Sequence, residues 1–268
     1  MRFRATAATL TTALALSALA VPAAHAAEKA PAKKAFAKNS GKTKITKVTV
    51  NGGKDIVVGT VKKKKFTIAV TATDPKGVDG ASAFLWHGKK LDRADGLLVP
   101  GNVEGKCKAV NKTTKTCTVT VVADPYVDVY GNNLAGQWKV WAAAGGKQGG
   151  FYSKDAFKTV RVKRAAKLTV NAAPEPVKKG KTITVTGALT RANWDSGKYA
   201  GYAKQPVKLE FKKKGSSTYK ALKTVRTDGK GKLRTTVKAS VDGTFRYVFA
   251  GTSTTPSVKS TGDFVDVK

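Results

Sequence analysis

Apolar and polar residues alternate along most of this chain in short stretches. Phe66, Ile68 and Val70 are separated by Thr67 and Ala69, and the stretch ends in an Asp-Pro-Lys-Gly turn sequence. A period of two predicts a strand with one face buried. Because no stretch keeps an apolar repeat of 3.6 residues, the sequence predicts an all-β protein.

The alternating stretches fall into two series. They recur at roughly ten-residue intervals, separated by Gly, Asn and Asp-Pro turns, which is typical of antiparallel β-sandwiches. The segment Arg-Val-Lys-Arg-Ala-Ala at 161–166 resembles a short hinge between the series. We therefore predict two β-sandwich domains, at 44–163 and 166–268, each long enough to enclose one core.

The N-terminus has the pattern of an export signal. Arg2 and Arg4 precede an uncharged Ala- and Leu-rich run, and Ala24-His25-Ala26 places small residues at the cleavage positions. These features predict a signal peptide at 1–26 and a secreted protein. A membrane anchor is the weaker alternative, since the run is short and rich in Thr and Ser. No second apolar run follows, so we expect no transmembrane segment in the mature chain.

The next segment, 27–43, is composed mainly of Ala, Lys and Pro. Its side chains offer too little apolar surface to offset the entropy lost on ordering the backbone. We predict that it is a flexible basic arm.

Cysteine usage agrees with export. The chain has two cysteines, Cys107 and Cys117. An isolated pair in an exported protein usually forms a disulfide. A metal site is the alternative, but the mature chain would offer it one histidine, His87, and no further cysteine. We predict the disulfide.

The charge is extreme. The chain holds 50 Lys and Arg residues against 17 Asp and Glu, a formal net charge of +33. Such a surface attracts polyanions. The excess is shared by the arm and both predicted domains, and lysines outnumber arginines, with no recognition helix or aromatic RNA-binding motif. We therefore expect no sequence-specific nucleic-acid binding, and we predict association with anionic envelope or extracellular polymers by a protein that is secreted or held at the cell wall.

Two lysine clusters are the strongest candidates for polyanion contacts. Lysines at strand ends also protect sheet edges against aggregation, which explains part of the excess. Both clusters lie at the ends of predicted strands. They are Lys62, Lys63, Lys64 and Lys65 in the first domain, and Lys212, Lys213 and Lys214 in the second.

The sequence offers few residues suited to catalysis, and we predict no catalytic residues and no enzymatic activity. The mature chain lacks the Gly-x-Ser-x-Gly elbow and a glycine loop that would cradle phosphate. His87 ends a predicted strand before a glycine. Asp92 and Asp95 are close in sequence but have the spacing of a turn, so they favour a structural role over general acid–base chemistry.

Calcium is the one metal for which the sequence offers candidate ligands, and no other cofactor is expected. Extracellular sandwiches hold Ca²⁺ with loop carboxylates and carbonyls. Asp74 and Asp79, with Asp124 and Asp128, follow strands and could share one end of a sandwich. The alternative is that they cap turns, which the basic charge of the domain favours.

The longest stretch of the second domain that we predict to be irregular, 191–206, carries several aromatic residues that could be exposed to solvent. Arg191, Trp194, Tyr199 and Tyr202 could form a platform for a glycan or a cell-wall polymer, as long aromatic loops often do. Alternatively, the rings fold back onto the end of the sandwich. Trp86 and Trp141 offer a second platform, because each has the opposite register to its apolar neighbours.

Longer stretches carry a resemblance. ITKVTVNGGKDIVVG at 45–59, ADPYVDVYGNNLAGQWKVWAAA at 123–144 and nearly all of 191–268 resemble secreted two-domain proteins of streptomycetes and their relatives. The resemblance implies Ig-like sandwiches, export and, for some members, calcium binding. It supplies no catalytic residues. The family's acidic loop after the Trp-Lys-Val strand is replaced here by Gly-Gly-Lys-Gln-Gly-Gly at 145–150. We expect a monomer.

Overall fold

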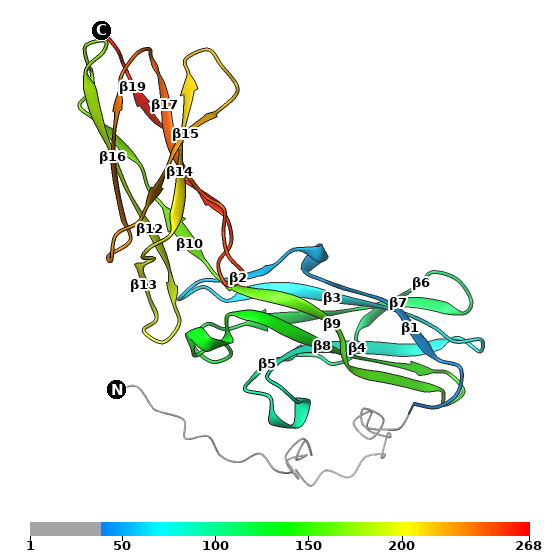
Figure 1. Cartoon of the computed structure of the whole chain (residues 1–268). Helices are drawn as coiled ribbons and strands as arrows, with labels where there is room; N and C mark the ends of the chain where they lie inside the picture. Colours follow the sequence, from blue (N-terminus) through cyan, green and yellow to red (C-terminus); the bar gives the residue numbers. More distant parts are fainter. Residues whose placement is uncertain (1–38) are drawn as a thin grey trace.

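The computed structural model describes residues 39–268, which form two β-sandwiches that meet at an angle (Figure 1). The signal-peptide prediction for 1–26 and the first part of the arm lie outside the described residues. Within 39–268, no helix is long and apolar enough to cross a membrane. The helical elements among the described residues are three short 3₁₀ turns: η2 (Asn51–Gly53), η3 (Leu91–Arg93) and η4 (Asn132–Leu134).

The first sandwich has two facing sheets. One sheet has the order β1-β3-β7-β6 and the other the order β2-β9-β8-β4-β5. The strands are β1 (Lys44–Val50), β2 (Ile56–Val58), β3 (Lys64–Thr73), β4 (Val78–His87), β5 (Gly96–Leu98), β6 (Lys106–Ala109), β7 (Thr114–Ala123), β8 (Gly136–Gly146) and β9 (Phe151–Arg164).

The strand order of this sandwich is Ig-like. Strands β1, β3, β4, β6, β7, β8 and β9, lettered A to G along the chain, give sheets A-B-E-D and G-F-C, which is the immunoglobulin arrangement. Strand β2 pairs in parallel with β9, whereas the other strand pairs between residues 39 and 268 are antiparallel. The disulfide between Cys107 and Cys117 is confirmed, but it joins neighbouring strands β6 and β7 of one sheet.

The predicted alternation is confirmed in β3, where Phe66, Ile68 and Val70 are buried and Thr67 is exposed. Strand β8 is buried on both faces. Trp138 and Val140 fill the core between the sheets, while Trp141 packs on the outer face with Trp86. The opposite register of these two tryptophans is therefore confirmed, but they are only 7% and 3% exposed and form a second, smaller cluster.

The second sandwich is built around β12. Strands β10 and β11 pair with one edge of β12, and β13 and β16 pair with the other. The facing sheet has the order β15-β14-β17-β18, with β19 also pairing with β17. The strands are β10 (Ala166–Leu168), β11 (Asn171–Ala173), β12 (Thr182–Asn193), β13 (Lys198–Gly201), β14 (Pro206–Lys213), β15 (Lys220–Arg226), β16 (Lys232–Lys238), β17 (Gly243–Phe249), β18 (Val258–Lys259) and β19 (Asp263–Val265).

The core of the second sandwich contains a buried tyrosine. The Tyr247 hydroxyl donates to the Val185 carbonyl across the two sheets at 3.0 Å. Tyr247 is fully buried, and this burial raises its pKa to about 12. A buried phenol needs such a partner, because an unpaired hydroxyl in an apolar core is costly.

The prediction of a flexible arm to residue 43 is wrong for its last residues. Ser40 forms backbone hydrogen bonds in both directions with Phe151 of β9. Asn39 accepts from the backbone N–H of Ser153 at 2.7 Å. Thr43 is buried beside Asp74. Residues 39–43 are therefore part of the first sandwich, held by strand-like pairing that their Lys- and Gly-containing sequence does not suggest.

Candidate functional site

The aromatic stretch at 191–206 lies at the junction between the sandwiches. Trp194 is only 4% exposed and packs with the core residues of the first sandwich, although the chain places it in the second. Its indole N–H donates to the Gly59 carbonyl at 3.0 Å. The prediction of an exposed platform is therefore wrong for Trp194, because a neighbouring domain covers the ring.

The other platform residues divide between the two cores. Tyr199 packs against the first core, and the Lys167 ammonium lies 4.1 Å from its ring centroid. Tyr202 packs against the second core, edge-on to Phe249 with ring centroids 5.7 Å apart. The Arg191 guanidinium stacks 3.7 Å above Tyr202. These contacts make the stretch a joint between domains.

One polar side chain that the sequence did not single out completes this joint. Asn132 of η4 accepts from the backbone N–H of Trp194 at 2.9 Å and donates to Asn193 at 2.8 Å. Its backbone N–H donates to the Asp195 carboxylate at 3.0 Å, and its side-chain amide also contacts that carboxylate. Nothing in the sequence singles out Asn132, because its hydrogen-bond partners are some 60 residues away in the chain.

Arg164 lies at the centre of the same joint. Its Nε donates to the Ala192 carbonyl at 2.5 Å, and the residue is 7% exposed. Burial, with a smaller contribution from the charge of Arg191, lowers the pKa of Arg164 to about 10. The guanidinium remains charged at neutral pH and ties the end of β9 to β12.

The four candidate calcium ligands do not share one end of the first sandwich. Strands β3 and β7 are antiparallel, with Lys64 opposite Ala123 and Thr73 opposite Thr114. Asp74 follows the last residue of β3, whereas Asp124 follows the last residue of β7. The two carboxylates are therefore at opposite ends of a ten-residue strand pair, about 30 Å apart at 3.3 Å per residue. The prediction of a shared end is wrong.

Three of the four candidate aspartates, Asp74, Asp124 and Asp128, have a structural partner. Asp74 accepts from the Thr43 hydroxyl at 2.6 Å and from the backbone N–H of Lys76 at 2.8 Å. These bonds, that of Thr43 first, hold the pKa of Asp74 below its usual value. A Cβ on Gly146 would collide with the Asp74 carboxylate. The glycine loop at 145–150 thus makes room for this hydrogen bond.

The aspartates at the other end are tied to a lysine. Asp124 pairs with Lys63 at 2.9 Å, which lowers the pKa of Asp124 and raises that of Lys63. Asp128 accepts from the backbone N–H of Asp124 at 2.7 Å. Asp79 is exposed at the start of β4. Across residues 39–268, no three carboxylate, histidine or cysteine side chains are grouped as metal ligands.

The two lysine clusters lie far apart. Lys62 and Lys65 are exposed where β3 begins, near the joint. Lys212 and Lys213 end β14, and Lys214 follows at the opposite end of the second sandwich. The clusters therefore do not form one patch, and the positive charge extends over both sandwiches.

The second cluster is interleaved with aromatic rings. The Lys212 ammonium lies 5.3 Å from the Tyr219 ring centroid, and the Arg246 guanidinium stacks 3.5 Å above the same ring. Arg246 also pairs with Glu210 at 2.7 Å. The Lys214 ammonium lies 5.8 Å from the Phe264 ring and pairs with Asp242 at 3.2 Å. Cations and apolar groups are thus mixed on this part of the surface.

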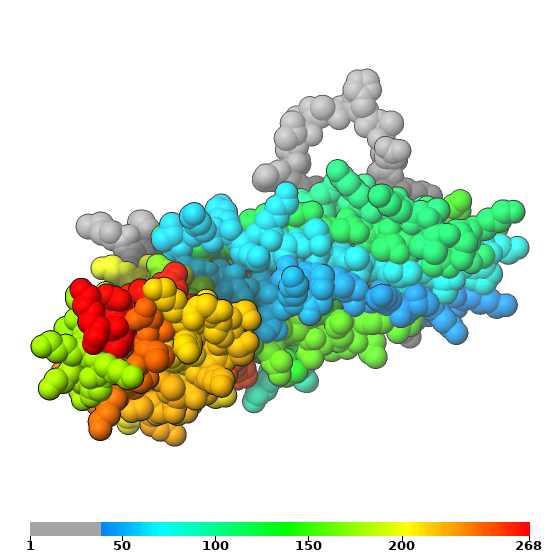
Figure 2. Space-filling model, turned by 90° about the horizontal axis from the view of Figure 1, so that it is seen from above, coloured from blue at the N-terminus to red at the C-terminus, as the bar shows by residue number. Residues whose placement is uncertain are grey.

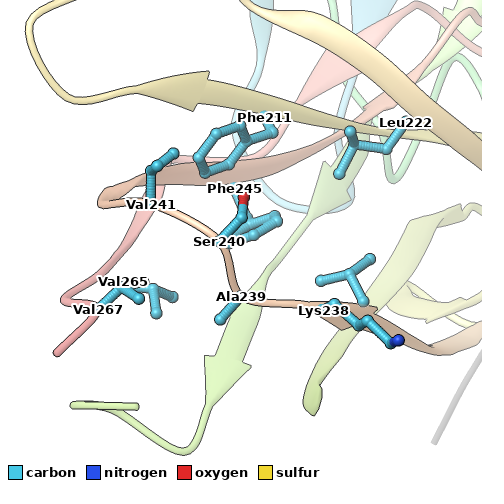
Figure 3. A pocket seen from close by; sticks show the side chains of 10 residues that line it. Phe211, Leu222, Lys238, Ala239, Ser240, Val241, Phe245, Val265 and Val267 are labelled. Carbon is cyan, nitrogen blue, oxygen red and sulfur yellow. The ribbon is translucent and has the colours of Figure 1, made fainter. Parts of the chain in front are cut away.

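The end of the second sandwich farthest from the first is hollowed. We call it the distal end. A groove of about 410 Å³ there is lined by Lys179, Lys213, Lys214, Ser240, Val241, Asp242, Val267 and Lys268. A smaller pocket of about 70 Å³ adjoins it between the sheets, and Phe211, Phe245 and Val241 point toward it (Figure 3). In Figure 2, which faces this end, the yellow, orange and red segments lie side by side.

His87 is engaged in a local contact. Its Nδ1 lies 2.6 Å from the Asp95 carboxylate, and its ring is tilted against Trp138 with centroids 5.5 Å apart. Asp95 and Asp92 belong to the loop after β4, which includes η3. Tyr130 also donates to the Asp95 carbonyl at 2.7 Å. The contacts of His87 thus secure this loop against the strand.

Comparison with known proteins adds only distant matches. No protein-family model and no curated protein matches the sequence. Among solved structures, a chimeric titin Z1Z2 is 14% identical over 84% of this chain and 96% of its own, with a TM-score of 0.25. The D00–D0 domain of intimin is 18% identical over 81% and 98%, with a TM-score of 0.27.

A third solved structure is a putative membrane anchored protein from Corynebacterium diphtheriae. It is 13% identical over 82% of this chain and 53% of its own, with a TM-score of 0.29. Similarities at this level assign no family or function. The Ig-like architecture therefore rests on the strand order of the structure itself.

Proposed function

We propose that this chain is an exported, non-catalytic protein that associates with anionic polymers of the cell envelope or extracellular matrix through its lysine-rich surface. The observation that carries the proposal is the net charge of +33 for the whole chain, an excess of Lys and Arg that the arm and both sandwiches share. A folded surface of this kind raises the local concentration of any polyanion.

The distribution of charge favours contacts without sequence or stereochemical selectivity. Few described lysines have a carboxylate partner; Lys63, Lys163 and Lys214 do. Ammonium groups on flexible stems act as point charges and do not impose the planar geometry of guanidinium contacts. Phosphate or carboxylate polymers are the partners that such a surface fits, and their affinity depends on counterion release.

Co-sedimentation with an insoluble polyphosphate-type wall polymer over a salt series tests this function, with a neutral polysaccharide as the matched control. We expect binding to the anionic polymer alone, falling by more than about tenfold between ~50 and ~200 mM salt. Absence of binding at low salt, or binding that salt does not weaken, would contradict the proposal.

Variants separate a diffuse surface from a single patch. Changing Lys62, Lys64 and Lys65 to Gln at one end, or Lys212 and Lys213 at the other, removes charge without breaking the Lys63 or Lys214 ion pairs. Each set should weaken polymer binding only in part. If one variant lost polymer binding completely and the other bound as the unaltered protein does, a single patch would be responsible for the binding.

A further inference from the structure

Two of the three exposed large apolar residues of the second sandwich lie at its distal end, and the third lines the pocket beside it. The three are Leu222, Val241 and Phe264, which are 45%, 38% and 43% exposed. Leu222 and Val241 line the apolar pocket, and Phe264 pairs with Thr244 at the distal end of β17. Single exposed apolar residues are common on proteins, but Val241 and Phe264 share this end, while Leu222 is level with the middle of β14.

The same end carries several lysines beside these apolar groups. Lys179, Lys213 and Lys214 line the groove beside Val241, and Lys238 lines the pocket. The one acidic side chain of the groove wall, Asp242, accepts from Lys214 and from the backbone N–H of Val267 at 2.9 Å. The groove wall therefore combines an excess of lysines with the apolar side chains of Val241 and Val267.

A hydrated anionic polymer would contact the lysines of this end but not its apolar side chains. Lysines alone hold a phosphate chain, which gains nothing from Val241 and Phe264. A bilayer presents anionic headgroups at its surface and apolar carbon beneath them, so lysine stems can lie along the interface with their ammonium groups among phosphates. The adjoining pocket, at about 70 Å³, accommodates a few methylene groups and is too small to enclose a lipid.

We propose that the distal end of the second sandwich docks onto an anionic phospholipid bilayer. Val241 and Phe264 enter the interface, and Lys179, Lys213 and Lys214 contact the headgroups. This inference goes beyond the proposed function, because its partner is a lipid bilayer, and the docking does not require binding to the wall polymer.

Vesicle co-sedimentation of the full mature chain tests the docking. Vesicles of phosphatidylcholine are compared with vesicles that also contain phosphatidylglycerol. The apolar variant combines Val241→Ser and Phe264→Ser, and its matched control combines Val103→Ser and Val110→Ser, which are exposed on the first sandwich. We expect the apolar variant to lose about tenfold in affinity for anionic vesicles and the control to bind as the unaltered protein does.

The lysines are tested in the same assay. Lys179→Gln with Lys213→Gln should lower vesicle affinity by roughly fivefold for each charge at low salt, whereas Lys106→Gln with Lys108→Gln on β6 should have a smaller effect. Circular dichroism melting verifies that each variant folds, and Val241→Thr with Phe264→Tyr replaces any apolar variant that does not.

The outcomes distinguish this docking from the general function. If the apolar variant and its control bind anionic vesicles equally, the docking is overturned, even if both bind the wall polymer. If wall-polymer binding is absent but vesicle binding depends on Val241 and Phe264, the docking stands without the polymer function. Binding to phosphatidylcholine alone that equals binding to anionic vesicles would also overturn it.

Discussion

At the residue scale, Trp194 contributes to a core that belongs to another domain. Replacing Trp194 with Ala removes a large buried ring and the hydrogen bond to the Gly59 carbonyl. We expect the free energy of unfolding to fall by about 3–5 kcal/mol. Urea unfolding measures this change, and Tyr126→Ala is the control, since Tyr126 is 61% exposed. An equal, small effect of both changes would mean that the indole is not packed.

The Asp74 carboxylate makes stability depend on pH. Its folded-state pKa is lowered, chiefly by the hydrogen bond from Thr43. The ionised carboxylate therefore stabilises the fold above the ordinary aspartate pKa near 4, and the stabilisation is lost as the pH falls through the lower folded-state pKa.

Melting temperatures of the unaltered protein and of Asp74→Asn, measured from pH 7 to pH 2.5, test this effect. We expect the variant to melt lower at pH 7, and the difference to shrink as the pH falls below about 4. Asp79→Asn is the control, because Asp79 is exposed. A difference for Asp74→Asn that stays constant over this range would contradict a role for its charge.

Single residues also mark the limit of the sequence prediction. The sequence singled out Trp194, Tyr199 and Tyr202, but the prediction that 191–206 is irregular is wrong, because β12 and β13 pair within it. An aromatic ring on a loop has the same sequence pattern whether it faces solvent or a second domain, because the burying surface is more than 100 residues away. Asn132 gave no signal for the same reason.

At the element scale, alternation predicts a strand and its buried face but not its neighbours. Phe66, Ile68 and Val70 were assigned to the core correctly, since the period of two depends on local geometry. Which strand ends meet depends on pairing direction. Asp74 and Asp124 both follow strands, yet the antiparallel pairing of β3 with β7 separates them.

The disulfide stabilises the β6–β7 hairpin. Cys107 and Cys117 are directly opposite each other and ten positions apart in the sequence. Closing a loop of this length lowers the entropy of the unfolded chain, which raises the free energy of unfolding by about 2–3 kcal/mol. Reduction should lower the free energy of unfolding by this amount.

Urea titrations with and without a reducing agent measure the contribution of the disulfide. The double variant Cys107→Ser with Cys117→Ser is the control and should not respond to the reducing agent. If reduction leaves the unfolding midpoint of the unaltered protein in place, the hairpin gains no stability from the bond.

At the scale of the whole molecule, the joint should make the two sandwiches unfold together. Asn132→Ala removes side-chain hydrogen bonds to Trp194 and Asn193 without changing either core. We expect one calorimetric transition in the unaltered protein and a broadened or divided transition in the variant. Asn133→Ala is the matched control, since Asn133 is the exposed neighbour. Two transitions already present in the unaltered protein would contradict coupling.

The joint also determines how a force would pass through the molecule. Strand β12 has twelve residues, so the second sandwich extends about 40 Å from the joint at 3.3 Å per residue. A flexible linker would let its far end swing freely. Because Trp194 directly follows β12 of the second sandwich and packs in the core of the first, a pull on that end is borne by packed side chains. The packing of Trp194 and the hydrogen bond of Arg164 therefore couple a load on one sandwich to the other.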